Sequence, residues 1–141
     1  MNLSYKIFES LPDEAREIRT TVFVIEQGFN EEFDTDDHHA THIVVYDKDN
    51  AIGTSRIIYS KKHNCYCIGR VAVLKEYRKQ NVGRYLMDIT EQEIIKRYGH
   101  INIGVSSQMR VAEFYEKLGY LKTDDTYLDE GCPHIWMTKD L

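Results

Sequence analysis

The sequence predicts a mixed α/β domain in which an antiparallel meander precedes one or two crossover helices. Residues 3–9 alternate apolar and polar side chains, and two further strand-like segments, 42–47 and 52–60, are joined by a polar turn. Residues 68–89 then pass from an apolar strand through a basic turn into a helical pattern. With 141 residues the chain can bury a core of its own, so we predict one domain over residues 1–141.

The N-terminal part is predicted to be a strand followed by a helix. Residues 3–9 form the opening strand, and Pro12 suits the first turn of a helix because its missing N–H needs no partner there. Apolar residues recur every three or four positions between 15 and 25, which predicts an amphipathic helix that ends near Gly28.

Residues 29–41 are the most polar stretch, with five carboxylates and two histidines. The spacing is not that of a calcium loop, because no glycine stands sixth and no glutamate twelfth after any of the aspartates. Three interpretations remain: a solvated loop, an acidic lip that attracts a substrate amine, and a metal site, for which the spacing gives no support. We predict that no metal is bound.

The middle of the chain is predicted to contain the central strand. Strands 42–47 and 52–60 are joined through 48–50, a hairpin signal. The polar turn 61–64 leads into strand 65–74, whose apolar residues fall on both faces. Two-faced apolarity is typical of a strand that is covered on both sides.

The remaining elements alternate helix and strand. A helix runs to about Tyr98 and ends at Gly99, and a short strand is expected over 101–105. A second helix, 109–118, ends at Gly119. Two closing strands, 120–123 and 135–138, are expected on either side of an irregular acidic segment.

The charges are unevenly distributed along the chain. The net charge of −5 argues against a general nucleic-acid binder. Residues 1–50 carry 4 basic and 12 acidic side chains, residues 51–100 carry 10 and 4, and residues 101–141 carry 4 and 7. A chain that is acidic overall but gathers cations in its middle suits a polyanionic ligand on one side and a cationic substrate on the other.

Composition also limits the location of the protein. No apolar run approaches the roughly 20 residues of a membrane span, and no signal segment opens the chain. Of the three cysteines, Cys65 and Cys67 stand two apart in one predicted strand, a poor geometry for a disulfide. We therefore expect reduced thiols and a cytoplasmic protein without a membrane partner.

The turn after the central strand is predicted to bind an anion. Arg78, Lys79 and Arg84 gather where a helix begins. The first turn of a helix has unpaired N–H groups and the positive end of the helix dipole, which together favour phosphate.

Four short motifs then occur in one order. Two of them are Arg78-x-x-Asn81-x-Gly83 and Ala112-x-Phe114-Tyr115-x-x-x-Gly119-Tyr120. The other two are Val22-Phe23-Val24-x-Glu26-Gln27 and Gly131-x-Pro133-His134-x-x-Met137. With these motifs the chain resembles the GNAT superfamily, the acetyl-CoA-dependent N-acetyltransferases, and within it the ElaA-type subgroup. Asn81 departs from the family, which has glycine there; asparagine tolerates the left-handed conformation, so the turn can be kept.

The resemblance implies a fold and a reaction. The fold would be that of the acyl-CoA N-acyltransferases: a central, mostly antiparallel twisted sheet, splayed at its middle strands, with helices on both faces. The reaction would be direct transfer of an acetyl group from acetyl-CoA to a primary amine of a small molecule or a protein, without a metal. The rival is a catalytically silent acyl-CoA-binding regulatory module. A Rossmann-type nucleotide-binding domain is disfavoured because no Gly-x-Gly-x-x-Gly is present.

The resemblance also assigns residues. It implies that acetyl-CoA is held by the central strand and the basic turn, through Val71, Ala72, Val73, Arg78, Lys79, Gln80, Asn81, Val82, Gly83 and Arg84. In residues 71–73 only the backbone would act, by polarising the thioester carbonyl, while the side chains pack in the core.

The catalytic candidates are Tyr115, Glu26 and His134. Tyr115 would hydrogen-bond the leaving thiolate, or else be a packed helix tyrosine. Glu26, His134 and the acidic stretch 31–37 are alternative bases. The alternative to a catalytic role is a polar helix end for Glu26 and a packed strand residue for His134. The sequence leaves open the acceptor amine and whether the protein is a monomer or a homodimer.

Overall fold

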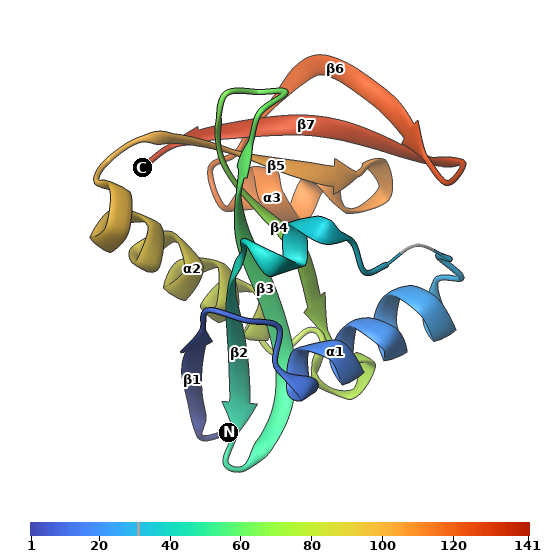
Figure 1. The fold of residues 1–141 in the computed structure, drawn as a ribbon. Helices are drawn as coiled ribbons and strands as arrows, with labels where there is room; N and C mark the ends of the chain where they lie inside the picture. The colour runs from blue at the N-terminus through green and yellow to red at the C-terminus, as the bar shows by residue number, and fades with distance from the viewer. Residues whose placement is uncertain (31) are drawn as a thin grey trace.

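The computed structural model describes residues 1–30 and 32–141, whose strands form one open sheet in the order β1-β2-β3-β4-β5-β7-β6 (Figure 1). The strands are β1 (Leu3–Phe8), β2 (Thr41–Asp47), β3 (Asn50–Ser60), β4 (Cys65–Val73), β5 (Asn102–Gln108), β6 (Leu121–Asp129) and β7 (Cys132–Asp140). The helices are α1 (Asp13–Arg19), η1 (Thr20–Glu26), η2 (Thr35–His38), η3 (Lys75–Tyr77), α2 (Val82–Tyr98), η4 (Met109–Val111) and α3 (Ala112–Lys117).

The sheet opens between its middle strands. Neighbouring strands pair antiparallel, except that β4 and β5 run parallel. Within the described residues these two strands pair with each other only at Cys67–Gly104 and Ile68–Val105; beyond that point β4 pairs only with β3, and β5 only with β7. The prediction of a mostly antiparallel sheet, splayed at its middle strands, is confirmed.

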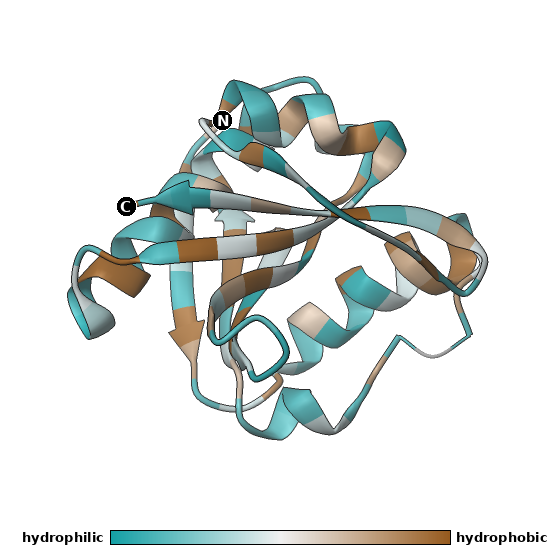
Figure 2. Cartoon of the chain, turned by 90° about the horizontal axis from the view of Figure 1, so that it is seen from above, coloured by the Kyte–Doolittle hydropathy of each residue, from teal (hydrophilic) through white to brown (hydrophobic). Residues whose placement is uncertain are grey.

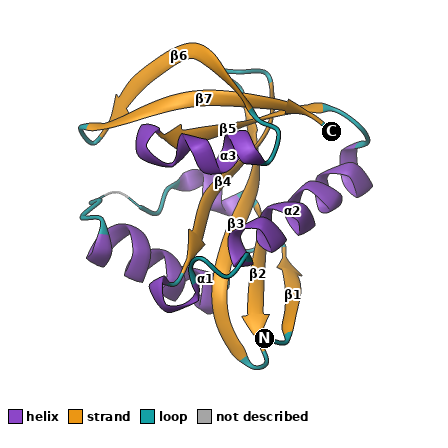
Figure 3. Cartoon of the chain, turned by 180° about the vertical axis from the view of Figure 1, so that it is seen from behind, coloured by secondary structure: helices purple, strands orange, loops and turns teal. Residues whose placement is uncertain are grey.

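Helices cover both faces of the sheet, as Figure 3 shows from behind. Side chains of successive strand residues point to opposite faces. On β2, Val44 and Tyr46 pack in one core cluster with α1, whereas Ile43 and Val45 pack in the other with α2 and α3. In Figure 2 hydrophobic residues recur along the strands, with hydrophilic turns between them.

The helix predicted from Pro12 to Gly28 is only partly α-helical. Seven residues form α1, and the chain then continues as the π-helix η1. Thr20 to Ile25 is a run rich in β-branched residues, which have low α-helix propensity. The apolar spacing therefore predicted the helical course of the segment but not its winding.

The prediction of an irregular acidic segment between residues 123 and 135 is wrong. The segment is a regular hairpin in which β6 runs to Asp129 and β7 begins at Cys132. Glu130 and Gly131, at the turn, both have positive φ (48° and 77°), as a type I′ hairpin turn requires. The sequence does not show β6 as a strand because its residues are mostly charged or polar. Charged residues are tolerated there because β6 is an edge strand with much of its surface in solvent.

Two further expectations of the sequence concern the thiols and the membrane. Cys65, Cys67 and Cys132 are free thiols, and burial raises the pKa of Cys67 to about 12. In the part of the chain that the structure describes, no helix has the length and apolarity needed to cross a membrane.

Candidate functional site

The end of β4 presents backbone groups to the gap between β4 and β5. The Leu74 N–H donates to the Ile52 carbonyl of β3 at 2.9 Å. Because successive residues direct their backbone groups to opposite edges of a strand, Val73 and Val71 direct theirs toward the gap. The Arg78 side chain confirms this for Val73, since its Nε donates to the Val73 carbonyl at 2.9 Å.

A β-bulge lies just before these residues. Gly69 pairs with Arg56 and Ala72 with Thr54, so β4 has one residue more than β3 in this interval. Arg70, inside the bulge, has φ +51°, a left-handed conformation that is uncommon for a residue with a side chain. The bulge therefore sets the direction in which the Val71 backbone points.

The basic turn joins β4 to α2 through two left-handed residues, Lys79 (φ +62°) and Asn81 (φ +64°). Asn81 is the N-cap of α2 and its side chain makes no capping hydrogen bond. The N–H groups of the first turn are thus the unpaired donors that can hold an anion. Asparagine has kept the turn that glycine would be expected to form.

Gly83 lies where α2 meets α3. A Cβ atom on Gly83 would stand 3.1 Å from Cζ and 3.2 Å from Cε1 of Phe114. Its φ is not in the left-handed region, so the glycine is needed for space and not for its dihedral angles.

A cavity of about 680 Å³ lies along this turn, and we call it the helix-side cavity. Its lining joins the end of β4, the basic turn and the η4–α3 segment. Its lining residues include Val71, Val73, Arg78, Lys79, Asn81, Val82, Gly83, Arg84, Arg110, Val111, Phe114 and Tyr115.

A second cavity, of about 160 Å³, lies toward the β6–β7 turn, and we call it the hairpin-side cavity. It is bounded by residues of η1, β4, β5 and β7, including Gln27, Arg70, Gln108 and His134. Val71, Val111 and Tyr115 line both cavities. The two cavities therefore meet at the gap between β4 and β5.

Tyr115 is buried on α3, with 8% of its surface exposed. Its ring packs edge-on against Phe114 and Tyr120. Its hydroxyl makes no hydrogen bond to any residue that the structure describes, and burial raises its pKa above the usual value. Tyr115 is thus a neutral, unengaged hydrogen-bond donor at the junction of the cavities.

His134 lies on β7 with 7% of its surface exposed and lines the hairpin-side cavity. Its Nδ1 is 2.8 Å from the Cys132 carbonyl oxygen. A carbonyl only accepts, so Nδ1 carries the proton, and in the neutral ring Nε2 then holds a lone pair. Among the described residues nothing donates to Nε2, which leaves it able to take up a proton.

Glu26, at the end of η1, is bound to Arg78. Its two carboxylate oxygens accept from the Arg78 guanidinium at 2.6 and 2.8 Å. These hydrogen bonds lower the pKa of Glu26. A carboxylate held in this way is a weak proton acceptor in this conformation, and the pair also engages one of the arginines predicted to contact phosphate.

Most of the predicted ligand-binding residues lie together. Eight of the ten line the helix-side cavity, as do several residues of α3. Ala72 faces the other side of the sheet, packed in the α1 cluster. Gln80 donates its Nε2 to the Glu76 carbonyl at 3.0 Å and lines a neighbouring hollow instead.

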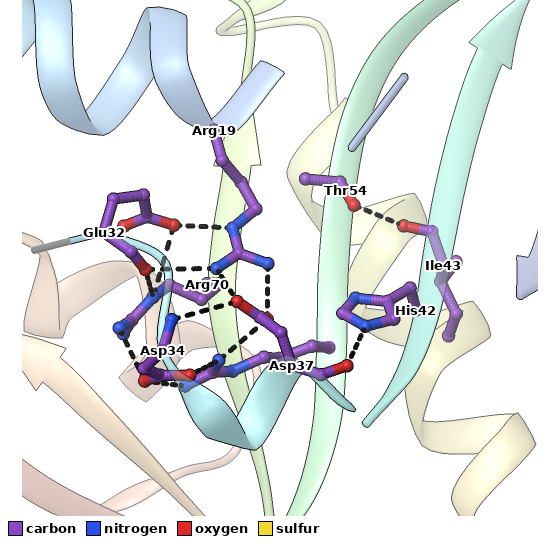
Figure 4. A network of polar contacts seen from close by, with 9 residues as sticks. Arg19, Glu32, Asp34, Asp37, His42, Ile43, Thr54 and Arg70 are labelled. Atoms are coloured by element: carbon purple, nitrogen blue, oxygen red, sulfur yellow. Dashed lines mark hydrogen bonds and ion pairs between the residues drawn. The ribbon is translucent and has the colours of Figure 1, made fainter. Parts of the chain in front are cut away.

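The acidic stretch 29–41 is neither an open lip nor simply solvated. Arg19, buried to 1% exposure, donates to Glu32 at 2.5 Å and to Asp37 at 2.8 Å (Figure 4). Arg56 donates to Asp37 at 2.9 Å and to Asp34 at 2.7 Å. Three arginines, including Arg70, thus neutralise three of the carboxylates, and Glu31 lies outside the described residues.

This buried ion network was missed by the sequence prediction. Arg19 falls on the apolar face of its helix, four residues after Ala15, and Arg56 interrupts an otherwise uncharged strand. Arginine at such positions indicates a buried partner. No group of three or more potential metal ligands is found among the described residues.

The comparisons with known proteins agree with this geometry. The sequence profile of the acetyltransferase (GNAT) domain matches residues 10–141. The chain therefore belongs to the GNAT acetyltransferase family.

Within the family its relatives include the ElaA protein, which supports the predicted ElaA-like subgroup. The solved structure of Escherichia coli ElaA matches with a TM-score of 0.86 and 25% identity, over 98% of this chain and 99% of that one. Protein YyaT of Bacillus subtilis is 34% identical over 100% of this chain and 97% of its own. An aminoglycoside 6'-N-acetyltransferase complexed with coenzyme A shares the fold, with a TM-score of 0.72 and 19% identity over 99% of this chain and 97% of that one.

Proposed function

We propose that the protein transfers an acetyl group from acetyl-CoA to a primary amine by direct attack. The observation that carries the proposal is the junction of the two cavities at the gap between β4 and β5. Tyr115 lines both cavities there and His134 lines the hairpin-side one. One substrate can enter from each side and meet the other at the gap.

The helix-side cavity suits the acyl-CoA. The N–H groups of the first turn of α2, with Lys79 and Arg84 beside them, offer donors and positive charge to a pyrophosphate. The backbone groups that Val71 and Val73 direct to the gap can pair with the amide groups of a pantetheine arm, as a strand pairs with a sheet edge. The coenzyme A in the solved aminoglycoside acetyltransferase complex supports this choice of ligand.

The hairpin-side cavity suits the amine. His134 Nε2 accepts the proton that the amine loses as its nitrogen bonds to the carbonyl carbon. The backbone near Val71 stabilises the negative charge that forms on the carbonyl oxygen. As the carbon–sulfur bond breaks, the Tyr115 hydroxyl donates a hydrogen bond to the departing thiolate.

Tyr115 stabilises that thiolate without having to ionise. The usual pKa of a phenol is about 10 and that of a thiol about 8.5, and burial moves the pKa of Tyr115 further up. Full proton transfer from Tyr115 is therefore unfavourable, and hydrogen bonding is the contribution that its position allows.

His134 is preferred to Glu26 as the base. The Glu26 carboxylate is held by Arg78, while the His134 Nε2 has no donor among the described residues. The rival function, a silent acyl-CoA-binding module, keeps the helix-side cavity but needs no base. His134 is therefore the residue at which the two functions differ.

The test is release of free CoA from acetyl-CoA across a panel of small amines and peptides. We expect His134→Gln to lower turnover by about 100-fold or more, the usual contribution of a positioned base. Acetyl-CoA affinity should be unchanged, and the exposed residue His100 supplies the control variant, His100→Gln. Tight CoA binding without release by any amine would favour the silent module.

A further inference from the structure

Arg70 combines an unfavourable backbone with a well-anchored side chain. Its φ of +51° places it in the left-handed region, which is unfavourable for a residue with a Cβ atom. Such a conformation persists only where the surroundings determine it. The side chain of Arg70 contacts two residues of the 29–41 stretch, Glu32 and Asp34.

The side chain of Arg70 is tied at two points. Its Nε donates to the Glu32 carbonyl at 3.1 Å and stands 3.3 Å from the Glu32 carboxylate. Its Nη2 donates to the Asp34 carboxylate at 3.2 Å. Figure 4 shows Arg70 beside Glu32 and Asp34 at the margin of the ion network.

These partners are themselves held from other elements. Glu32 is bound by Arg19 at the end of α1, and Asp34 by Arg56 on β3. Arg56 is the residue that pairs with Gly69, next to Arg70 on β4. The network thus ties α1, β3 and residues 32–37 to the bulge of β4, and its charges balance.

We propose that Arg70 is a positioning residue, which through Glu32 and Asp34 holds the β4 bulge and so aims the Val71 backbone at the reacting carbonyl. Val71 directs its backbone to the gap and lines both cavities. A backbone donor must be placed to within about 1 Å to be effective. The proposal rests on the proposed function, since it assigns the reacting group to this gap.

Three substitutions separate the backbone from the side chain. Arg70→Ala removes the ties and keeps a Cβ that disfavours positive φ. Arg70→Gly also removes the ties, but glycine adopts positive φ without strain. Arg70→Lys keeps the charge and can reach one of the two partners.

If Arg70 acts through the bulge, Arg70→Ala should lower kcat by about 10- to 100-fold, as expected for a donor moved by about 1 Å. Arg70→Gly should retain several-fold more activity than Arg70→Ala, and the Kd for CoA should change little in either. Asp34→Asn, which loosens the same tie at a half-exposed residue, should lower kcat in the same direction. Equal losses in the alanine and glycine variants, or a change in the amine KM alone, would overturn the proposal.

Lys48 offers a matched control. It is an exposed basic residue with φ +55° in the β2–β3 turn, away from both cavities. Lys48→Ala and Lys48→Gly should differ in thermal stability but not in kcat. A matching kcat loss at Lys48 would show that the effect is general destabilisation.

The bulge can also be followed without turnover. The amide resonance of Val71 should shift in Arg70→Ala and stay closer to its wild-type position in Arg70→Gly. If no amine of the panel makes the wild-type protein release CoA, the proposed function fails. The Val71 amide resonance still tests whether Arg70 holds the bulge. An unshifted Val71 amide in Arg70→Ala overturns this inference.

Discussion

The contact between Gly83 and Phe114 allows a quantitative test of the helix-side cavity. A Cβ on Gly83 would approach the Phe114 ring to 3.1 and 3.2 Å, a few tenths of an ångström too close. Alanine can be accommodated by a small movement of the ring. Valine carries two further methyl groups on that Cβ, and it would displace the Phe114 ring into the cavity that Phe114 lines.

The size of the effect follows from the cost of overpacking. Extra methyl groups in a packed site cost about 1–3 kcal/mol. If that strain falls on the ligand-bound state, Gly83→Val weakens CoA binding roughly 5- to 150-fold, since each 1.4 kcal/mol is tenfold. Gly83→Ala should weaken binding much less, because only one methyl group is added.

Asn81→Gly is the matched change in the same turn. Asn81 has φ +64° and no capping hydrogen bond, so glycine takes over its conformation without losing a capping hydrogen bond. Calorimetric titration with CoA should give an unchanged or lower Kd for Asn81→Gly and a raised one for Gly83→Val. A strong loss of binding in Asn81→Gly would refute the reasoning, because it would mean that the asparagine side chain itself holds the ligand.

Three other predictions concern the remaining charged and polar groups. Tyr115→Phe should lower turnover by roughly 10- to 1000-fold at unchanged CoA affinity; equal steady-state rates would exclude a hydrogen bond to the thiolate. Asp129→Asn, at the hairpin-side cavity, should raise the KM for cationic amines, more so at low salt; a salt-independent KM would contradict this. Asp37 has its pKa lowered by Arg19 and Arg56 against the effect of burial. Its contribution to stability is therefore present above the unfolded pKa of about 3.9 and lost as the pH falls below it, which thermal unfolding at pH 7, 4 and 3 would reveal.

Much of the fold could be predicted because it is encoded in short-range patterns. The two-faced apolar strand before Arg78 and the helix after it follow from periodicity alone. The family resemblance then supplied the splay of the sheet and placed eight of the ten ligand-binding candidates on one cavity. Ala72 does not line this cavity, because successive side chains of a strand point to opposite faces of the sheet. Three consecutive residues therefore cannot all face one cavity.

The ion network could not be predicted because it depends on tertiary pairing. Counting charges gives an acidic N-terminal part, and the interpretation as an acidic lip assumed that these carboxylates reach solvent. Glu32 and Asp37 are buried instead, at 5% exposure each, against Arg19. The arginines that neutralise these carboxylates lie on other elements of the fold. A short stretch of sequence therefore cannot reveal the pairing.

This pairing changes where the predicted charge separation arises. Arg56 and Arg70 belong to the basic middle of the chain but are engaged by Asp34, so they add little to the field along the basic turn. In the described lining of the helix-side cavity Arg78 is likewise engaged, by Glu26, but four more basic side chains, Lys79, Arg84, Arg110 and Lys117, stand against the single carboxylate Glu113. On the hairpin side, Glu32 and Arg70 belong to the ion network and offset each other, while the carboxylates Asp129 and Glu130 lie at the β6–β7 turn. The predicted separation of positive from negative charge is therefore retained, but its acidic half comes mainly from the β6–β7 turn and not from the stretch that the composition singles out.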